Sequence, residues 1–139
     1  MATTPIYTAI ATSAGRDGRS VSNDGVLDVT LARPAELGGD GKGTNPEQLF
    51  AAGYSACFAS AMQLVAGRMG LDASDASVTA EISLIPLDGG RFGLAAVLRV
   101  ELPEHLHGEE GTKLVEATHQ VCPYSNATRG NIEVELVVE

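Results

Sequence analysis

The longest apolar stretch of the chain follows a clear helix-start signal. Asn45 is suited to the N-cap, Pro46 fits the first helical position, and Gln48 can reach back as in a capping box. From residue 49 to residue 69 nearly every position is apolar or small, which predicts a long helix buried on most of its faces. Gly70 is placed to end it. This helix is the expected centre of the fold.

Three strand patterns precede that helix. Residues 6–14 are apolar and β-branched, and residues 19–22 and 26–31 follow, the last with alternating apolar and polar positions. Polar, glycine-rich turns separate them at residues 15–18 and 23–25. The pattern predicts an antiparallel three-stranded sheet. The segment 34–43 is so rich in glycine that we expect a loop.

The pattern after the helix predicts a second sheet and a second helix. Residues 77–87 and 91–102 read as a hairpin, 109–121 as a helix, and 132–136 as a last strand. Pro123 opposes continuation of the second helix, so Cys122 is expected at a helix end or kink. The order is β-β-β-α-β-β-α-β. It indicates an α+β fold, with residues 1–139 as one domain and no βαβ pattern.

Composition and charge narrow the classes of function. The chain is 44% hydrophobic, and we see no apolar run approaching the ~20 residues of a membrane span. Nine Lys and Arg face eighteen Asp and Glu, a net charge of -9 that opposes binding to nucleic acid or anionic lipid. The first residues lack a secretory pattern, so we expect a reducing, cytoplasmic setting. The two cysteines there suggest redox chemistry or metal binding more than a structural disulfide.

Cys57 has two interpretations on the residues alone. It lies in the long helix among Phe50, Tyr54 and Phe58, an apolar setting that would raise its pKa and leave it inert. It is then a small core side chain. A nearby cation would instead make it a nucleophile. Arginines in polar, turn-like contexts are the candidates, although each is equally suited to a solvated surface; they are Arg16, Arg19 and Arg129.

Cys122 lies 65 positions beyond Cys57 (122 - 57). It has no neighbouring cysteine or close histidine pair, so local spacing predicts no zinc site. His119 could share its helical face, although a lone histidine is more often structural. His105 and His107 are expected in a loop.

Two segments resemble a known family closely. They are residues 44–58, TNPEQLFAAGYSACF, and residues 121–132, VCPYSNATRGNI. Both resemble the organic hydroperoxide resistance proteins of bacteria, the Ohr branch of the Ohr/OsmC family. The likeness extends to GRDGR at 15–19 and DGVL at 24–27, and it is weakest between residues 72 and 108.

The resemblance implies an OsmC-like fold, an intertwined homodimer, and two active sites at the subunit interface. Cys57 would be oxidised by the hydroperoxide to a sulfenic acid, and Cys122 would resolve it to a disulfide. Arg16 would hold the thiolate, and Glu47 would orient Arg16. No bound cofactor or metal is implied. Dihydrolipoyl groups of a lipoylated protein would reopen the disulfide, rather than thioredoxin.

The implied chemistry gives the apolar neighbours of Cys57 a second meaning. A guanidinium beside the thiol would lower its pKa and stabilise the departing alkoxide. Phe50, Tyr54 and Phe58 would then be walls that admit alkyl chains, which favours lipid-like or aryl hydroperoxides over hydrogen peroxide. Their other interpretation is plain core.

Helix geometry adds a constraint. Glu47 and Cys57 are ten residues apart (57 - 47), about 15 Å along a straight helix, so one arginine cannot easily touch both. Either the helix breaks or Glu47 comes from the other subunit. Two antiparallel copies crossing near Ala52 would bring residue 47 of one to residue 57 of the other, and the small residues 51–53 would allow close approach.

Other functions compete with this one. An OsmC-type peroxidase would use similar chemistry with a different peroxide preference. A non-catalytic redox sensor or lipid-binding module would keep the fold without turnover. A hydrolase using Cys57 lacks a histidine placed as base.

Overall fold

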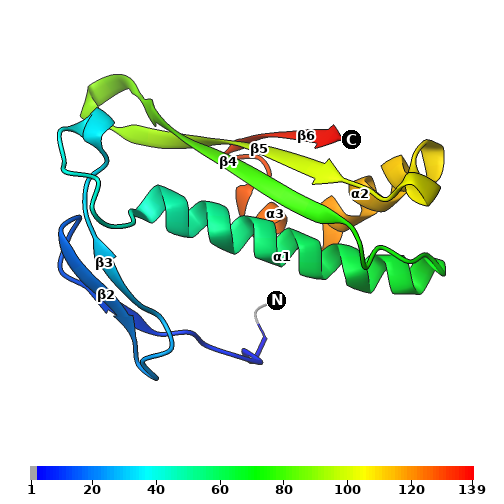
Figure 1. Ribbon diagram of the computed structural model, residues 1–139, viewed down its shortest axis with the longest axis horizontal. Helices are drawn as coiled ribbons and strands as arrows, with labels where there is room; N and C mark the ends of the chain where they lie inside the picture. Colours follow the sequence, from blue (N-terminus) through cyan, green and yellow to red (C-terminus); the bar gives the residue numbers. More distant parts are fainter. Residues whose placement is uncertain (1–2) are drawn as a thin grey trace. The chain divides into compact units, whose positions relative to one another are not determined.

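The computed structural model describes residues 3–139, and the chain forms two compact units, Met1–Pro46 and Glu47–Glu139. Figure 1 shows the elements of each unit along the chain. The assignment of residues 1–139 to one domain stays a prediction.

The first unit is a three-stranded antiparallel sheet. Its strands are β1 (Ala11–Ser13), β2 (Gly18–Ser22) and β3 (Asp28–Leu31), in the order β1-β2-β3. The three predicted strands and the turn at residues 23–25 are confirmed. The start of the first strand is wrong, since pairing begins only at Ala11, opposite Ser22. Strand β2 ends at Ser22, where the turn at residues 23–25 begins. Residues 6–9 therefore lie beyond the end of the strand that pairs with β1.

The turn and loop of this unit are shaped by glycines. Arg16 lies in a bend flanked by Gly15 and Gly18, whose φ values of 124° and 121° favour glycine. The predicted loop at 34–43 also contains a short 3-10 turn, η1 (Ala35–Leu37). A parallel bridge between Leu31 and Thr44 closes the loop at its base.

The second unit is built on helix α1 (Pro46–Met69), which confirms the predicted start and end. Gly70 adopts φ 72°, a left-handed conformation typical of a helix stop. The expectation of burial on most faces is wrong in this chain, because only one side of α1 meets other elements of its unit. The buried positions are Tyr54, Phe58, Ala61, Met62, Val65 and Ala66. The opposite side carries exposed small or polar residues: Ala52, Ala56, Ser60, Gln63 and Gly67.

The sheet of this unit has the order β4-β5-β6. Strands β4 (Ser77–Pro86) and β5 (Phe92–Glu101) form the predicted hairpin, joined by the turn η2 (Asp88–Gly90). Strand β6 (Glu133–Val138) adds to β5 in parallel. The order of the predicted strands and long helices is therefore confirmed.

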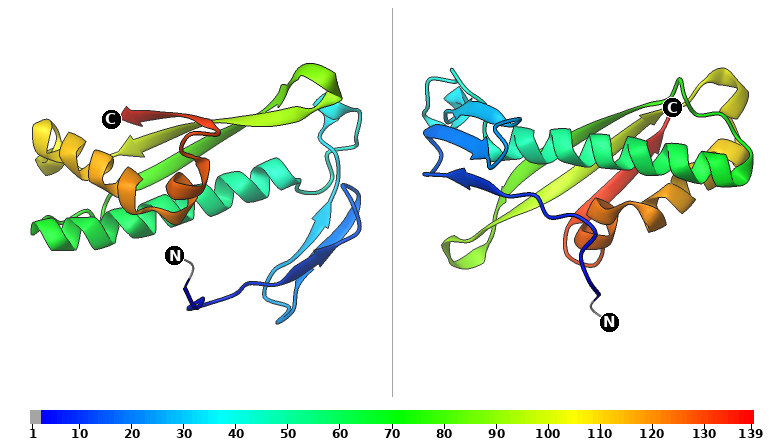
Figure 2. Two further views of the ribbon diagram at one scale, coloured as in Figure 1. Left: turned by 180° about the vertical axis from the view of Figure 1, so that it is seen from behind. Right: turned by 90° about the horizontal axis from the view of Figure 1, so that it is seen from below.

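Helix α2 (Glu109–Val121) has the predicted bounds, whereas two short elements were not predicted. These are the 3-10 turn η3 (Glu104–Leu106) and helix α3 (Pro123–Thr128). All three helices cover one face of the sheet, with α2 and α3 beside α1 (Figure 2). The core between them contains Tyr54, Phe58, Met62, Leu98, Val100, Leu114 and Val115.

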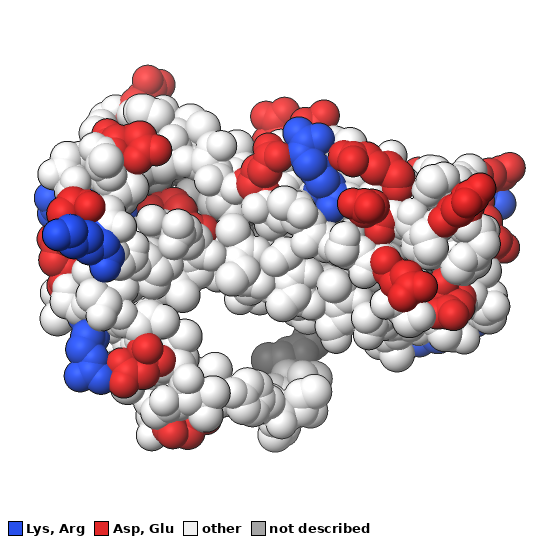
Figure 3. Space-filling model, viewed as in Figure 1, with Lys and Arg blue, Asp and Glu red and all other residues white. Residues whose placement is uncertain are grey.

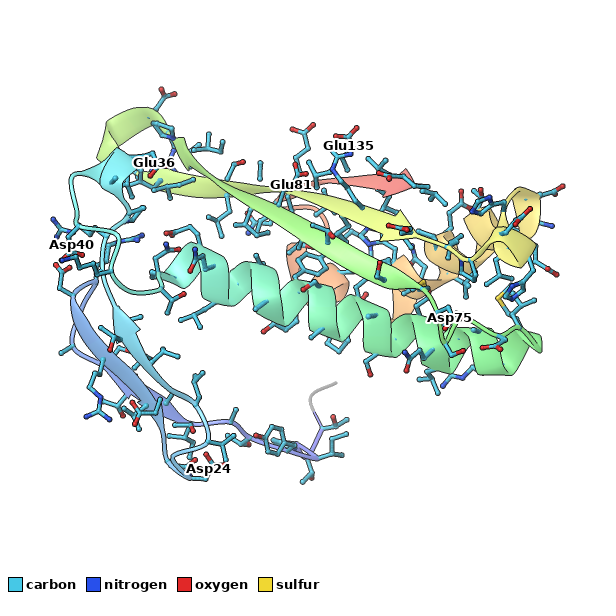
Figure 4. The ribbon with its side chains drawn as sticks, viewed as in Figure 1. Asp24, Glu36, Asp40, Asp75, Glu81 and Glu135 are labelled. Atoms are coloured by element: carbon cyan, nitrogen blue, oxygen red, sulfur yellow. The ribbon has the colours of Figure 1, made fainter. Side chains whose placement is uncertain are left out.

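The other face of this sheet is acidic. Glu81 and Glu135 point away from α1 (Figure 4), and Arg99 pairs with Glu81 at 2.6 Å. Asp and Glu outnumber Lys and Arg over this part of the surface (Figure 3). Part of the chain's negative charge thus lies on a solvated sheet face.

Among the described residues, α1 is the one helix long and apolar enough to cross a membrane by length and composition, with a hydropathy of 1.4. The expectation that no apolar run approaches that length is therefore wrong, because the many alanines of α1 count as apolar. Core helices of soluble proteins meet the same criterion, and the buried side of α1 belongs to the core of this unit.

Candidate functional site

The two cysteines face each other inside the second unit. Cys57 projects from the middle of α1, and Cys122 lies between α2 and α3. Their Sγ atoms are 3.6 Å apart, and both thiols are free. Disulfide formation requires a separation of about 2.05 Å, so a small side-chain movement would close the bond.

The break between α2 and α3 places Cys122. Its backbone is extended, with φ -60° and ψ 123°, while its N–H still bonds the carbonyl of Thr118 at 2.9 Å. Pro123 begins α3, lacks an N–H, and disfavours helical geometry in the residue before it. The prediction that Cys122 lies at a helix end or kink is confirmed.

The environment of Cys57 opposes its ionisation. Burial has the largest effect and raises the pKa of the Cys57 thiol, a hydrogen bond from the backbone N–H of Tyr124 lowers it, and Cys122 raises it further. None of these influences is a positive charge. A cation beside the sulfur would lower the pKa and so oppose the effect of burial.

Accessibility distinguishes the two thiols. Cys122 is fully buried, whereas Cys57 is partly exposed and lines a cavity of about 510 Å³. The other lining residues are Ser60, Ala61, Leu64, Val121 and Pro123. An apolar molecule in this cavity would reach the sulfur of Cys57 first.

An aromatic group lies on the N-terminal side of Cys57. The ring of Tyr124 is 5.8 Å from that of Phe50 and 5.6 Å from that of Tyr54. A Cβ atom on Gly53 would lie 2.6 Å from the Tyr124 hydroxyl oxygen. Gly53 therefore makes room for Tyr124 of the same chain, a role the sequence did not suggest.

The predicted substrate walls are buried to different degrees. Tyr54 and Phe58 are fully buried in the core, and Phe50 is half-buried. None of the three lines the cavity beside Cys57. Their burial favours the core interpretation for Tyr54 and Phe58, while a role in substrate binding stays a prediction.

The candidate cations differ in their partners. Arg19 forms a bidentate pair with Asp28, and Arg129 bonds the Asn126 side chain and the carbonyl of His119. Both arginines therefore have polar partners close to them in sequence or on neighbouring strands and helices. Arg16 lies in the bend before β2, within the first unit.

Glu47 lies in the first turn of α1 and is half-buried. Since α1 is unbroken from Pro46 to Met69, the alternative of a helix break between Glu47 and Cys57 is wrong. The two residues of one chain stay about 15 Å apart along the helix.

The histidines have structural partners. His105 and His107 each bond a backbone carbonyl, those of Asp72 and Leu102. His119 bonds the hydroxyl of Ser125 at 2.8 Å. Within residues 3–139 no group of three or more His, Cys, Asp or Glu side chains could hold a metal ion.

Sequence reasoning missed the residues that complete the site. Ser60 and Leu64 follow Cys57 at helical spacings of three and seven residues, so the period could have indicated them. Val121, Pro123 and Tyr124 reach Cys57 only through the packing of α2 and α3 on α1, which no local pattern encodes.

The class of structure is therefore an α+β unit in which an accessible cysteine on the central helix faces a buried cysteine at a helix break. Comparison with known proteins shows which family has this fold. The family model described as OsmC-like protein matches residues 39–137. An organic hydroperoxide resistance protein of Xanthomonas axonopodis pv. citri is 51% identical over 136 residues, 96% of this chain and 94% of that protein.

Solved structures show the same likeness. A crystal structure of a putative organic hydroperoxide resistance protein from Vibrio cholerae matches with a TM-score of 0.92 and 45% identity, covering 97% of this chain and 93% of that one. OhrB of Bacillus subtilis matches with a TM-score of 0.87 and 41% identity, covering 97% and 100%. The chain belongs to the OsmC family and, within it, to the branch of organic hydroperoxide resistance proteins.

Proposed function

We propose that this protein is a thiol peroxidase that reduces organic hydroperoxides to alcohols, with Cys57 as the attacking thiolate and Cys122 as the resolving thiol. The observation that carries the proposal is the 3.6 Å approach of the two sulfur atoms, one accessible and one buried. Membership of the organic hydroperoxide resistance branch supports a redox role in such resistance.

The first step oxidises Cys57. Its thiolate attacks the terminal oxygen of R–O–O–H, the O–O bond breaks, and the products are a sulfenic acid and an alkoxide that takes a proton to become the alcohol. The attacking sulfur must be reachable, and Cys57 lines the cavity while Cys122 is fully buried. This difference in exposure supports Cys57 as the attacking thiol and Cys122 as the resolving thiol.

The second step protects Cys57 from further oxidation. The Cys122 thiol attacks the sulfenic sulfur, the S–O bond breaks, and a disulfide and water form. A dithiol then reduces the disulfide to two thiols and is itself oxidised to a disulfide. By resemblance to the family we take the dithiol to be a dihydrolipoyl group of a lipoylated protein.

The cavity supports an apolar substrate. Leu64, Val121 and Pro123 offer carbon surface beside the sulfur, with the Ser60 hydroxyl as a polar neighbour. Alkyl or aryl tails of a hydroperoxide gain free energy by leaving water for such surface, whereas hydrogen peroxide has no tail to bury. The Vibrio cholerae relative holds captopril in one of its active sites, so a site in a related protein accepts a small organic molecule.

Arg16 and Glu47 complete the proposal. The raised pKa of Cys57 calls for a cation, and Arg16 matches the family's catalytic arginine; Glu47 matches its carboxylate partner. A guanidinium offers a planar fork that a carboxylate can hold bidentately while another N–H faces the sulfur. We place this assembly at the interface of a homodimer in the cytoplasm.

A turnover assay tests the proposal. Reduced protein is mixed with cumene hydroperoxide, and peroxide loss is followed with dihydrolipoamide, glutathione or thioredoxin as reductant. We expect continuous turnover with dihydrolipoamide, none in Cys57→Ser, and a single oxidation followed by stalling or overoxidation in Cys122→Ser. Full activity in Cys57→Ser would end the proposal, and one oxidation without turnover in the wild type would indicate a sensor.

A further inference from the structure

A cluster of polar side chains is buried where α1, α2 and α3 meet. The hydroxyl of Tyr54 lies 2.9 Å from Ser125 Oγ and 3.2 Å from Thr128 Oγ1. Ser125 Oγ lies 2.8 Å from Nδ1 of His119, near the end of α2. The cluster therefore links all three helices through one serine.

The burial of these groups shows that the cluster is specific. Tyr54 and Ser125 are 0% exposed, and Thr128 is 2% exposed. A buried hydroxyl stabilises a fold only when it is bonded, and its bonds fix direction as well as distance. A phenylalanine in place of Tyr54 would fill nearly the same volume. The hydroxyl hydrogen bonds therefore fix how the three helices are oriented at this point, which apolar packing alone does not do.

The cluster holds the segment that carries the resolving thiol. Ser125 is three residues after Cys122 and one after Tyr124, all within the break and first turn of α3. Cys122 supplies the facing sulfur at 3.6 Å, and Tyr124 supplies the N–H that bonds Cys57. A shift of α3 along α1 would move both groups relative to Cys57.

We propose that Tyr54, Ser125 and His119 are positioning residues for the resolving step, which hold Cys122 within reach of Cys57. The inference rests on the proposed function. Two reactions compete for the Cys57 sulfenic acid. Cys122 converts it to a disulfide with release of water, whereas a second hydroperoxide converts it to a sulfinic acid with release of a second alcohol. The cluster favours the first.

The test separates the two steps kinetically in the full-length protein. Rapid mixing with cumene hydroperoxide gives the rate of Cys57 oxidation, which depends on hydroperoxide concentration, and the rate of disulfide closure, which does not. Mass spectrometry measures the sulfinic fraction. For Ser125→Ala and Tyr54→Phe we expect closure about tenfold slower, the scale of one lost buried hydrogen bond, with a larger sulfinic fraction.

Two comparisons separate positioning from stability. Thr118→Val removes another fully buried hydroxyl, which donates to the Leu114 carbonyl of its own helix, so closure should keep its wild-type rate. His119→Asn keeps a polar atom near the position of Nδ1 and should close faster than His119→Leu. Melting temperatures of all variants show whether stability tracks closure.

The outcomes are distinct. Closure in Ser125→Ala and Tyr54→Phe that is as fast as in Thr118→Val overturns the inference, and so does an equal slowing in all three. A wild-type protein that forms no disulfide between Cys57 and Cys122 contradicts the proposed function instead.

Discussion

At the residue scale, the Cys57 thiol combines partial exposure with an environment that raises its pKa. Burial is the main cause, and the Tyr124 N–H offsets it only in part. A raised pKa means that the thiolate appears only at higher pH, so a cation that lowers the pKa moves reactivity toward neutral pH.

If Arg16 is the cation that lowers the pKa of Cys57, its removal should have a measurable effect. In a Cys122→Ser background, Arg16→Ala should shift the pH profile of Cys57 alkylation by iodoacetamide to higher pH, by about one unit or more. Arg16→Lys keeps the charge without the planar guanidinium, so its pH profile should lie between those of the Arg16 protein and Arg16→Ala. Arg19→Ala is the matched control, because Arg19 is paired with Asp28. An unchanged profile in Arg16→Ala contradicts the role of Arg16.

His119 gives a second prediction at this scale. Burial, and secondarily the charge of Arg129, lower the pKa of His119 in the folded state. The unfolded chain then binds a proton at higher pH than the folded chain, so this contribution to stability is present above the ordinary pKa of about 6.5 and is lost as pH falls through the folded pKa. Urea unfolding should show a larger loss between pH 7.5 and 5.5 in the wild type than in His119→Asn. An equal loss of stability in the wild type and in His119→Asn would contradict the lowered pKa of His119.

The sequence predicted part of this site and not the rest. The motifs around Cys57 and Cys122 indicated a reactive pair, whereas the residues alone left Cys57 equally suited to the core. The cavity side chain Leu64, 51% exposed on the open side of α1, could be indicated by helical spacing. Tyr124 could not, because its contact with Cys57 depends on how α3 packs.

At the element scale, α1 and α2 illustrate which boundaries are local. Asn45, Pro46 and Gly70 encode the ends of α1 in capping chemistry, and Pro123 encodes the end of α2, so both helices matched their predicted bounds. Helix α3 has six residues, too few for a periodic pattern, and it was missed. Strand β1 was predicted too long because its pairing partner, not its own composition, sets its length.

Two glycines of α1 test how α3 lies against it. Gly67 has nothing within 4 Å of an added Cβ, so Gly67→Ala should stabilise the protein by up to about 1 kcal/mol through helix propensity. At Gly53 the Cβ would meet the Tyr124 hydroxyl at 2.6 Å. Gly53→Ala should therefore stabilise less, or destabilise, and should slow disulfide closure. Thermal unfolding measures the change in stability, and rapid mixing measures the rate of disulfide closure. An equal gain in stability in Gly67→Ala and Gly53→Ala would contradict the contact between Gly53 and Tyr124.

At the scale of the whole molecule, the continuity of α1 supports a shared site in the proposed homodimer. A straight helix separates Glu47 from Cys57 of its own chain by about 15 Å. The exposed side of α1, which includes Ala52, offers small residues for a crossing with a second copy. Gly53, first assigned to that crossing, instead accommodates Tyr124, so Ala52 is the better candidate for the point of closest approach.

Subunit mixing tests whether Glu47 acts on the cysteine of its partner. Glu47→Ala and Cys57→Ser homodimers should each be nearly inactive, since every site lacks one residue. If Glu47 acts across the interface, a mixed dimer has one site with Cys57 from one chain and Glu47 from the other, and an equimolar mixture should recover about a quarter of wild-type turnover. Mixing by unfolding and refolding, with light scattering to confirm dimers, provides the measurement. No recovery in confirmed mixed dimers would place both residues in the same subunit's site, which the unbroken helix opposes. An active Glu47→Ala homodimer would instead remove Glu47 from catalysis.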